Sequence, residues 1–263
     1  MTWPFENDTS AITKKLAKKS LQSEKRRNLM VVIAVALASC LICFSIVMAL
    51  STRQIEKNHV EDTYEAVYTK ITEEDVSTLK GLDDFSRVGE YYMLAVEPAE
   101  QGYNASYIYC DEETMYIARD QMKLLEGRLP QKEDEVVVSR YFLSNYGADA
   151  GIGEKVMLSS ESFHGEYTVT GIMEGYKEKE VNGTSILLSK EALKGWSGYD
   201  PADYRAYVHF KNEQQMDETE LTARSREIAK EYQLEMPVMN LSYMKFYKQP
   251  VNVSMLALVA GIA

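Results

Sequence analysis

The chain has 263 residues, of which 45% are hydrophobic and 26% charged, a composition typical of one or two globular domains and not of a disordered chain. The net charge of −11 excludes nucleic acid as an expected partner, because phosphates attract a basic surface. The charge is unevenly divided: seven Lys or Arg stand against three acids before Leu29, and the remainder carries a balance of −15. This division predicts that the two parts face different compartments.

Residues 1–28 form a basic tail, expected in the cytoplasm. From Ser10 to Arg27 the spacing predicts a helix that Ser10 caps, with Ile12 and Leu16 on one face and lysines around them. Anionic lipids of the inner leaflet would hold such a helix against the membrane. A solvated helix with no lipid role fits the same residues.

Residues 29–50 are 22 consecutive residues without a charge. A helix of that length reaches about 33 Å, enough for a hydrocarbon core of about 30 Å. Lys25, Arg26 and Arg27 lie directly before it, and the positive-inside rule therefore predicts a cytoplasmic N-terminus and an extracytoplasmic domain. The expected location is the inner or cytoplasmic membrane, with the lipid bilayer as a partner.

Two other interpretations of this stretch are a buried core helix and a cleaved signal peptide. The uninterrupted apolar run exceeds what a globular helix usually hides. Ala49-Leu50-Ser51 resembles a cleavage site, but the apolar region of a signal peptide is only about 7–15 residues long. The length favours a membrane anchor.

Residues 51–249 alternate strand-like and helix-like segments. Ala66–Ile71 alternates as a strand, and Thr72 with Asp75 resembles a capping box for a helix over Glu73–Lys80 that Gly81 ends. Helical spacing returns over Asp217–Tyr232. Further strands are predicted at Val88–Val96, Ala105–Cys110, Val136–Val138, Lys155–Leu158, Tyr167–Ile172, Ser185–Leu188 and Tyr204–Phe210.

This order predicts an α+β fold with two lobes. Residues 51–120 together with 203–249 form an α/β membrane-proximal lobe, and residues 121–202 form an inserted β-rich lobe. Cys40 and Cys43 lie inside the apolar stretch, so that Cys110 has no disulfide partner in the outer domain. The fold must therefore depend on its core.

Residues 250–263 are expected to begin a second membrane helix that is cut short. From Val251 to Ala263 there are 13 residues without a charge, too few to span a bilayer and too apolar for an exposed tail. A truncated longer protein is favoured over a short tail that touches the membrane.

No residue is assigned a catalytic, cofactor-binding or metal-binding role. The three histidines, His59, His164 and His209, lack cysteine partners at zinc-ligand spacing, and His209 is expected to be structural. Neither a nucleophile elbow nor a nucleotide loop is present, and Gly151-Ile-Gly153 lacks the third glycine. The acidic run 131–135 lacks calcium-loop spacing. The chain is therefore predicted not to be an enzyme.

Four motifs in register resemble the extracytoplasmic domain of FtsX/MacB-type ABC transporter permeases. They are Gly127-Arg-Leu-Pro130, Glu135-Val-Val-Val-Ser139, Gly153-Glu-Lys-Val156 and Tyr167-Thr-Val-Thr-Gly-Ile172. They match that family's G-R-x-P turn, its E-V-V-V-S strand, its G-x-x-V strand start and its F-x-V-x-G-I strand. The basic tail also resembles the sequence that leads into the family's first helix.

The resemblance implies a membrane subunit whose outer domain binds a substrate or partner and transmits motion driven by a separate cytoplasmic ATPase. Any ATP hydrolysis would reside in that ABC ATPase, and the arrangement allows a second permease subunit. The family's cytoplasmic loop that touches the ATPase follows the second helix, beyond this sequence. Two alternatives are a single-pass sensor or adhesion protein that binds an extracellular ligand, and a secreted enzyme released by cleavage near Ser51.

Overall fold

A computed structural model describes residues 10–99, 102–119, 121–145, 150–175, 178 and 183–248. The described residues fall into two compact units, one up to Ile55 and one that begins at Glu56. Residues 250–263, expected to begin a second membrane helix, lie outside the described residues.

The first unit is helical. α1 spans Ser10–Ser23, and α2 begins at Lys25 and continues to Val60. The predicted basic helix therefore ends four residues earlier than expected. Lys25, Arg26 and Arg27, which were assigned to it, belong to α2. The most apolar 18-residue window of α2 has a mean hydropathy of 2.9 and none of it is buried, which argues against a core helix. By length and composition α2 can cross a membrane.

Two polar side chains in the apolar part of α2 satisfy their hydroxyls within the helix. Ser39 donates to the carbonyl of Val35 at 2.9 Å, and Ser45 donates to that of Leu41 at 2.8 Å. Because each hydroxyl has an internal acceptor, neither needs water within the apolar stretch. The helix also continues beyond that stretch, from Ser51 to Val60.

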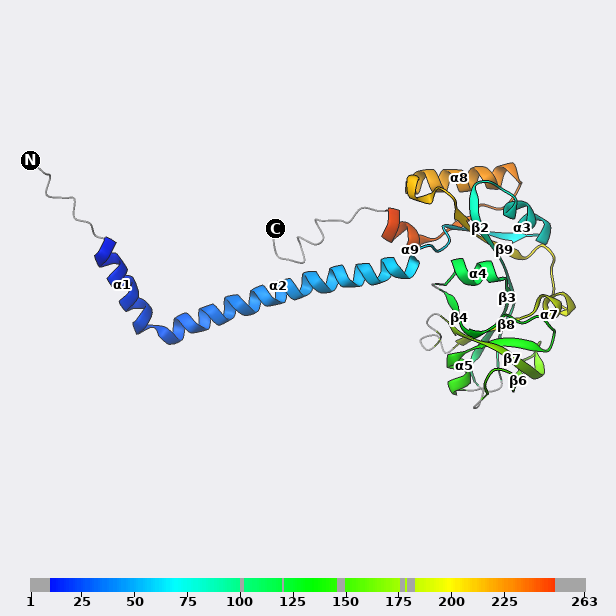
Figure 1. Ribbon diagram of the computed structural model, residues 1–263, viewed down its shortest axis with the longest axis horizontal. Helices are drawn as coiled ribbons and strands as arrows, with labels where there is room; N and C mark the ends of the chain where they lie inside the picture. Colours follow the sequence, from blue (N-terminus) through cyan, green and yellow to red (C-terminus); the bar gives the residue numbers. More distant parts are fainter. Residues whose placement is uncertain are drawn as a thin grey trace, which may run out of the picture. The chain divides into compact units, whose positions relative to one another are not determined.

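The second unit is an α+β domain with one mixed ten-stranded sheet (Figure 1). The strand order is β10-β1-β9-β2-β3-β8-β5-β7-β4. β6 lies outside this order and pairs with β7. All the predicted strands are present, several with longer bounds. The strands are β1 Ala66–Ile71, β2 Phe85–Pro98, β3 Asn104–Cys110, β4 Met122–Gly127, β5 Glu135–Ser139, β6 Lys155–Ser159, β7 His164–Gly175, β8 Gly183–Leu188, β9 Tyr204–Phe210 and β10 Val238–Met239.

The strand order separates the sheet into two halves by sequence. β10, β1, β9, β2 and β3 come from residues 51–120 and 203–249, whereas β8, β5, β7, β4 and β6 come from residues 121–202. The halves meet where β3 runs parallel to β8, from Asn104 opposite Gly183 to Ile108 opposite Leu187. Among its described residues, the inserted half also contains the short helices α5 and α7.

Helices cover both faces of the sheet. α3, α5, α7 and α8 contribute Val76, Phe142, Leu193 and Leu221 to the larger core, and α4 contributes Met115 to the smaller core on the other face. The helices are α3 Glu73–Lys80, α4 Glu112–Ile117, α5 Arg140–Asn145, α7 Lys190–Gly195, α8 Glu218–Glu231 and α9 Leu241–Tyr243, with short turns η1 Glu213–Gln215 and η2 Met244–Lys248.

Capping explains where the two longer helices of this domain begin. The capping box of Thr72 and Asp75 is confirmed at α3, and Gly81 follows its last residue as predicted. Asp217 and Glu220 form an equivalent box at α8. Such boxes satisfy two backbone N–H groups that a helix start otherwise leaves unpaired.

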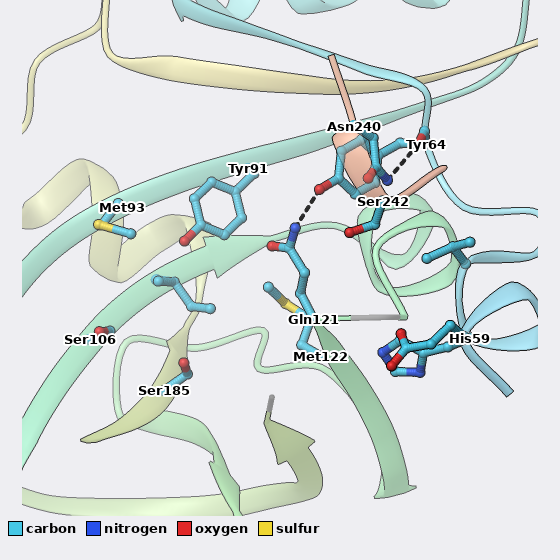
Figure 2. A pocket seen from close by; sticks show the side chains of 13 residues that line it. His59, Tyr64, Tyr91, Met93, Ser106, Gln121, Met122, Ser185, Asn240 and Ser242 are labelled. Atoms are coloured by element: carbon cyan, nitrogen blue, oxygen red, sulfur yellow. Dashed lines mark hydrogen bonds between the residues drawn. The ribbon is translucent and has the colours of Figure 1, made fainter. Parts of the chain in front are cut away.

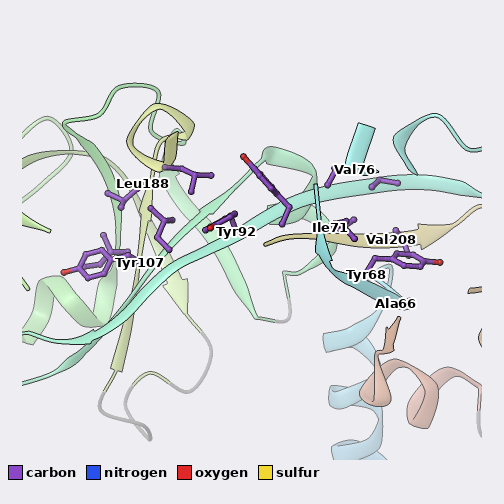
Figure 3. Packing of buried hydrophobic residues seen from close by; sticks show 14 of the residues in the cluster. Ala66, Tyr68, Ile71, Val76, Tyr92, Tyr107, Leu188 and Val208 are labelled. Atoms are coloured by element: carbon purple, nitrogen blue, oxygen red, sulfur yellow. The ribbon is translucent and has the colours of Figure 1, made fainter. Parts of the chain in front are cut away.

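Aromatic residues fill much of the larger core (Figure 3). Tyr68, Tyr92 and Tyr107 are almost completely buried, and their strands bring them to one face of the sheet. Tyr68 donates its hydroxyl to the carbonyl of Ser225 in α8 at 2.9 Å. That bond fixes α8 on the sheet, since a buried hydroxyl is costly without a partner.

Candidate functional site

The chain enters the sheet domain through the last turn of α2 and leaves it through α9 and η2, and a single asparagine joins these two segments. Asn240 donates its backbone N–H to the carbonyl of Glu65 at 2.8 Å and its side-chain amide to that of Tyr64 at 2.9 Å. Its Oδ1 accepts from the N–H of Tyr243 at 3.1 Å and so caps α9. The entering and leaving segments therefore share one set of hydrogen bonds.

A buried carboxylate makes a second connection at the same place. Glu65 is completely buried; one oxygen accepts from the N–H of Phe210 at 2.8 Å, and the other lies 2.7 Å from Nδ1 of His209. Burial raises the pKa of Glu65. Burial alone would lower the pKa of His209, but the bond and the charge of Glu65 raise it. The pair therefore holds a proton to a higher pH than a free histidine would.

We call Tyr64, Glu65, His209, Phe210 and Asn240 the junction. They come from the two residues before β1, the last two residues of β9 and the residue before α9. The junction thus connects three segments that are distant in sequence but adjacent at one end of the sheet.

A cavity of about 380 Å³ lies beside the junction (Figure 2). The sheet contributes Tyr91, Met93, Ser106, Ile108 and Ser185. The surrounding segments contribute Glu56, His59, Val60, Tyr64, Gln121, Met122, Asn240 and Ser242.

Both apolar and polar side chains line the cavity. Gln121 donates its amide N–H to the Tyr64 hydroxyl, which joins the segment before β4 to the segment before β1. Tyr64 and Tyr91 both contact Tyr207 edge-on, with ring centroids 4.7 and 5.6 Å apart. A volume in this range suits a small ligand or a single side chain of a partner. The lining contains carboxylate, imidazole, amide and hydroxyl groups, which can bind a ligand through hydrogen bonds.

A second polar cluster links the two halves of the sheet domain. Glu90 on β2 is buried, and Lys190 at the start of α7 lies 2.6 Å from it and 2.7 Å from Glu73 on α3. We call this cluster the α3–α7 network. Its members are Glu73, Lys80, Glu90, Asp111, Lys190 and Lys194. Three carboxylates thus face three lysines, and the charges balance.

The family-like motifs meet around β4, β5 and β7. Arg128 forms a two-pronged ion pair with Glu135, at 2.8 and 2.7 Å, and Glu135 also accepts from the N–H of Gln131 at 2.8 Å. The ion pair with Arg128 and these backbone bonds lower the pKa of Glu135 to about 2. The ion pair between Arg128 and Glu135 therefore holds the turn before β5 in place.

Two motif glycines are required by close backbone approach. Gly127 has a φ of +82°, and a Cβ there would collide with the carbonyl of Thr170. A Cβ on Gly171 would lie 2.8 Å from the carbonyl of Arg128. Both strands must therefore carry glycine where Gly127 of β4 pairs with Gly171 of β7.

Residues 29–226 match the family described as MacB-like periplasmic core domain. The match covers well over half of the chain. The chain belongs to this family.

Three solved structures are similar to this chain. The extracellular domain of the noncanonic ABC-type transporter YknZ from Gram-positive bacteria is 15% identical, with a TM-score of 0.47 over 68% of this chain and 100% of that one. The periplasmic region of MacB from Actinobacillus actinomycetemcomitans is 11% identical, with a TM-score of 0.47 over 70% and 91%. A domain of a putative permease from Porphyromonas gingivalis is 16% identical, with a TM-score of 0.46 over 74% and 96%. No curated protein sequence matches.

The resemblance predicted from the sequence is thus confirmed at the level of the family. In this MacB-like core domain the four motifs form a structural framework, because their charged and glycine residues contact one another and the backbone. The prediction that no residue is catalytic stays a prediction. In the part of the chain that the structure describes, no group of three or more His, Cys, Asp or Glu could hold a metal ion.

The three histidines singled out in the sequence lie in separate places. His209 pairs with Glu65, His59 lines the cavity, and His164 begins β7. Sequence reasoning missed Asn240 and Glu65. Asn240 is an N-cap residue type before a helical turn, a signal that was available. Glu65 is a charged residue beside a strand and gave no sign that it would be buried.

Proposed function

We propose that this chain forms part of a membrane subunit of an FtsX/MacB-type ABC transporter, with α2 as its cytoplasm-to-outside membrane helix. The sheet domain acts outside the membrane, where it binds a substrate or partner and transmits motion driven by a separate cytoplasmic ATPase. Family membership and the apolar length of α2 support this proposal. The two predicted lobes correspond in it to the two sequence-separated halves of the sheet.

The observation that carries the mechanical role is the double connection at the junction. Asn240 bonds to the carbonyls of Tyr64 and Glu65, so that the segments entering and leaving the domain cannot move independently. A displacement of one segment therefore pulls on β1 and, through Glu65, on β9. A hydrogen-bonded pair of strands transmits such a displacement well, because its ladder is stiff.

The test compares two asparagine variants in the whole membrane complex. Asn240→Ala removes both side-chain bonds, whereas Asn212→Ala alters an exposed asparagine that makes no side-chain cap bond. Spin labels on Lys132→Cys and Lys230→Cys, one in each half of the sheet domain, report ATP-dependent distance changes by pulsed electron resonance.

The proposal predicts that Asn240→Ala reduces the ATP-dependent distance change while ATP hydrolysis continues, and that Asn212→Ala behaves as the unaltered protein. Purification of the intact protein from membranes of its host should recover an ABC ATPase, identified by mass spectrometry. Full ATP-dependent motion in Asn240→Ala would contradict the mechanical role, and absence of any ABC ATPase would contradict the transporter role.

A second candidate function is a membrane-anchored receptor for an extracellular ligand, favoured by the cavity beside the junction. Its volume of about 380 Å³ falls within the range of small-molecule sites. Replacing Ser106, which lines the cavity, with Trp should fill the cavity and leave the hydrogen bonds of the junction intact. Ligand-dependent signalling that this variant abolishes, in cells without the ATPase, would favour the receptor over the transporter.

A further inference from the structure

The sheet ends at β4, whose outer edge has no strand beside it among the described residues (Figure 1). Met122 donates its N–H to the carbonyl of Ala118 on the side away from β7. Since alternate residues of a strand direct their N–H groups to the same side, Leu124 also presents its backbone outward. Such an edge can accept a further strand.

A groove of about 660 Å³ lies between this edge and α4. Its apolar lining is Met115 and Tyr116 from α4 and Leu124 and Leu129 from the β4 region. Tyr116 is 44% exposed, and the guanidinium of Arg87 lies 4.1 Å from the centroid of its ring. An edge strand facing a helix across an apolar groove is the arrangement that receives an extended peptide.

The charged residues of the groove are mainly cationic, in contrast to the rest of the chain. Its lining holds Arg119, Lys123 and Arg128 and one carboxylate, Glu112, whereas the whole chain has a net charge of −11. Arg119 pairs with Asp62, and Arg128 pairs with Glu135. Lys123 is exposed and makes no ion pair within the described part of the chain.

We propose that this groove binds an extended segment of a partner protein, which adds a strand to β4. The segment's apolar side chains lie over Tyr116 and Leu124, and an acidic side chain pairs with Lys123. The outward backbone groups of β4 supply affinity, and the apolar surface and the cations select the sequence. This surface is separate from the junction and does not depend on the transport function.

The first test separates backbone pairing from side-chain contact at one position. Leu124→Pro removes the outward N–H, whereas Leu124→Ala shortens the same side chain and keeps the N–H. The probe is the peptide Val-Glu-Val-Glu-Val-amide with fluorescein on its N-terminal amine, added to the full chain in lipid nanodiscs and followed by anisotropy. Leu124→Pro should bind at least about tenfold more weakly than Leu124→Ala. Equal binding by the two variants, with equal melting temperatures, would overturn strand addition.

The second test concerns charge. Lys123→Glu should weaken binding of the glutamate probe at least about threefold and improve binding of the corresponding lysine peptide, whereas Lys230→Glu, on an exposed site of α8, should change neither. Equal affinity of the unaltered protein for both peptides would refute the acidic partner. A self-association in sedimentation that Leu124→Pro abolishes, with no peptide binding, would assign the edge to a second copy of this chain and overturn a foreign partner.

Discussion

Replacing Arg128 with methionine removes both side-chain donors from the buried oxygens of Glu135 and leaves the backbone bonds from Gln131 and Lys132. The pKa of Glu135 is lowered from 4.5 to about 2, and each unit corresponds to about 1.4 kcal/mol. The full shift would thus correspond to roughly 3 kcal/mol, part of which comes from the retained backbone bonds. The Arg128 side chain is 49% exposed, so water and salt reduce its share, and we expect Arg128→Met to cost about 1.5–2 kcal/mol.

The assay is thermal unfolding of the full chain in detergent, followed by fluorescence of Trp196 in a background with Trp3→Phe. Trp196 packs against the larger core beside Phe163. For a domain of this size the expected loss lowers the melting temperature by about 3–8 °C. Arg140→Met is the matched control, because Arg140 and Glu126 are both exposed and lie 4.0 Å apart.

The pH dependence gives the sharper test. A carboxyl group whose folded pKa is lowered contributes stability above its unfolded pKa of 4.5, and this contribution is lost as the pH falls toward about 2. The difference between the unaltered protein and Arg128→Met should therefore be constant near pH 7 and shrink between about pH 4.5 and pH 2. A difference that is as large at pH 2.5 as at pH 7, or one that Arg140→Met reproduces, would refute the reasoning.

Three further predictions follow from the same geometry. Gly171→Ala should cost about 1–3 kcal/mol in thermal unfolding, because the added Cβ approaches the carbonyl of Arg128. Glu65→Gln should lower the pKa of His209 in an NMR titration, because the carboxylate charge that raises this pKa is lost. In the unaltered protein, the stability that His209 contributes is present below pH 6.5. It is lost as the pH rises through the raised pKa of His209. An impermeant maleimide should label Ser197→Cys in intact cells but Ser20→Cys only after lysis, in a background without Cys40 and Cys43.

Each of these predictions has its own contrary result. Gly195→Ala is the control for the glycine test, because a Cβ there meets only Glu133 Oε1 at 3.6 Å; an equal loss in both variants would show that crowding is not the cause. An unchanged titration of His209 would mean that Glu65 does not set its protonation. Labelling of the tail in intact cells would reverse the proposed topology.

Local signals in the sequence predicted the individual elements well. Thr72 and Asp217 start helices, and the alternation over Tyr204–Phe210 reproduces β9 without an error in its bounds. α4 was not predicted, because six residues are too few to show helical spacing. Its only signal is Asp111, whose side chain caps the helix.

Long-range pairing could not be derived in the same way. Nothing in the alternation of Asn104–Cys110 or Gly183–Leu188 indicates that these strands run parallel and join the two halves of the sheet. The burial of Glu65 is likewise a consequence of packing: its oxygens reach His209 and Phe210, far along the chain. Motif resemblance identified the framework around Arg128 and missed the junction, whose bonds involve mostly backbone atoms.

The junction and the α3–α7 network are connected by the sheet itself. Glu65 is bonded to the end of β9, β9 pairs along β2 from Phe85 to Tyr91, and Glu90 on β2 holds Lys190. A shift at Asn240 therefore reaches α7 through the Glu65 bond, the β9–β2 ladder and one part-buried ion pair. Lys190→Met would remove the ion pair with Glu90, the last step of this path, and leave the hydrogen bonds of the junction intact. If the distance change expected on ATP binding survived that substitution but not Asn240→Ala, the motion would have to pass through the β3–β8 pairing instead.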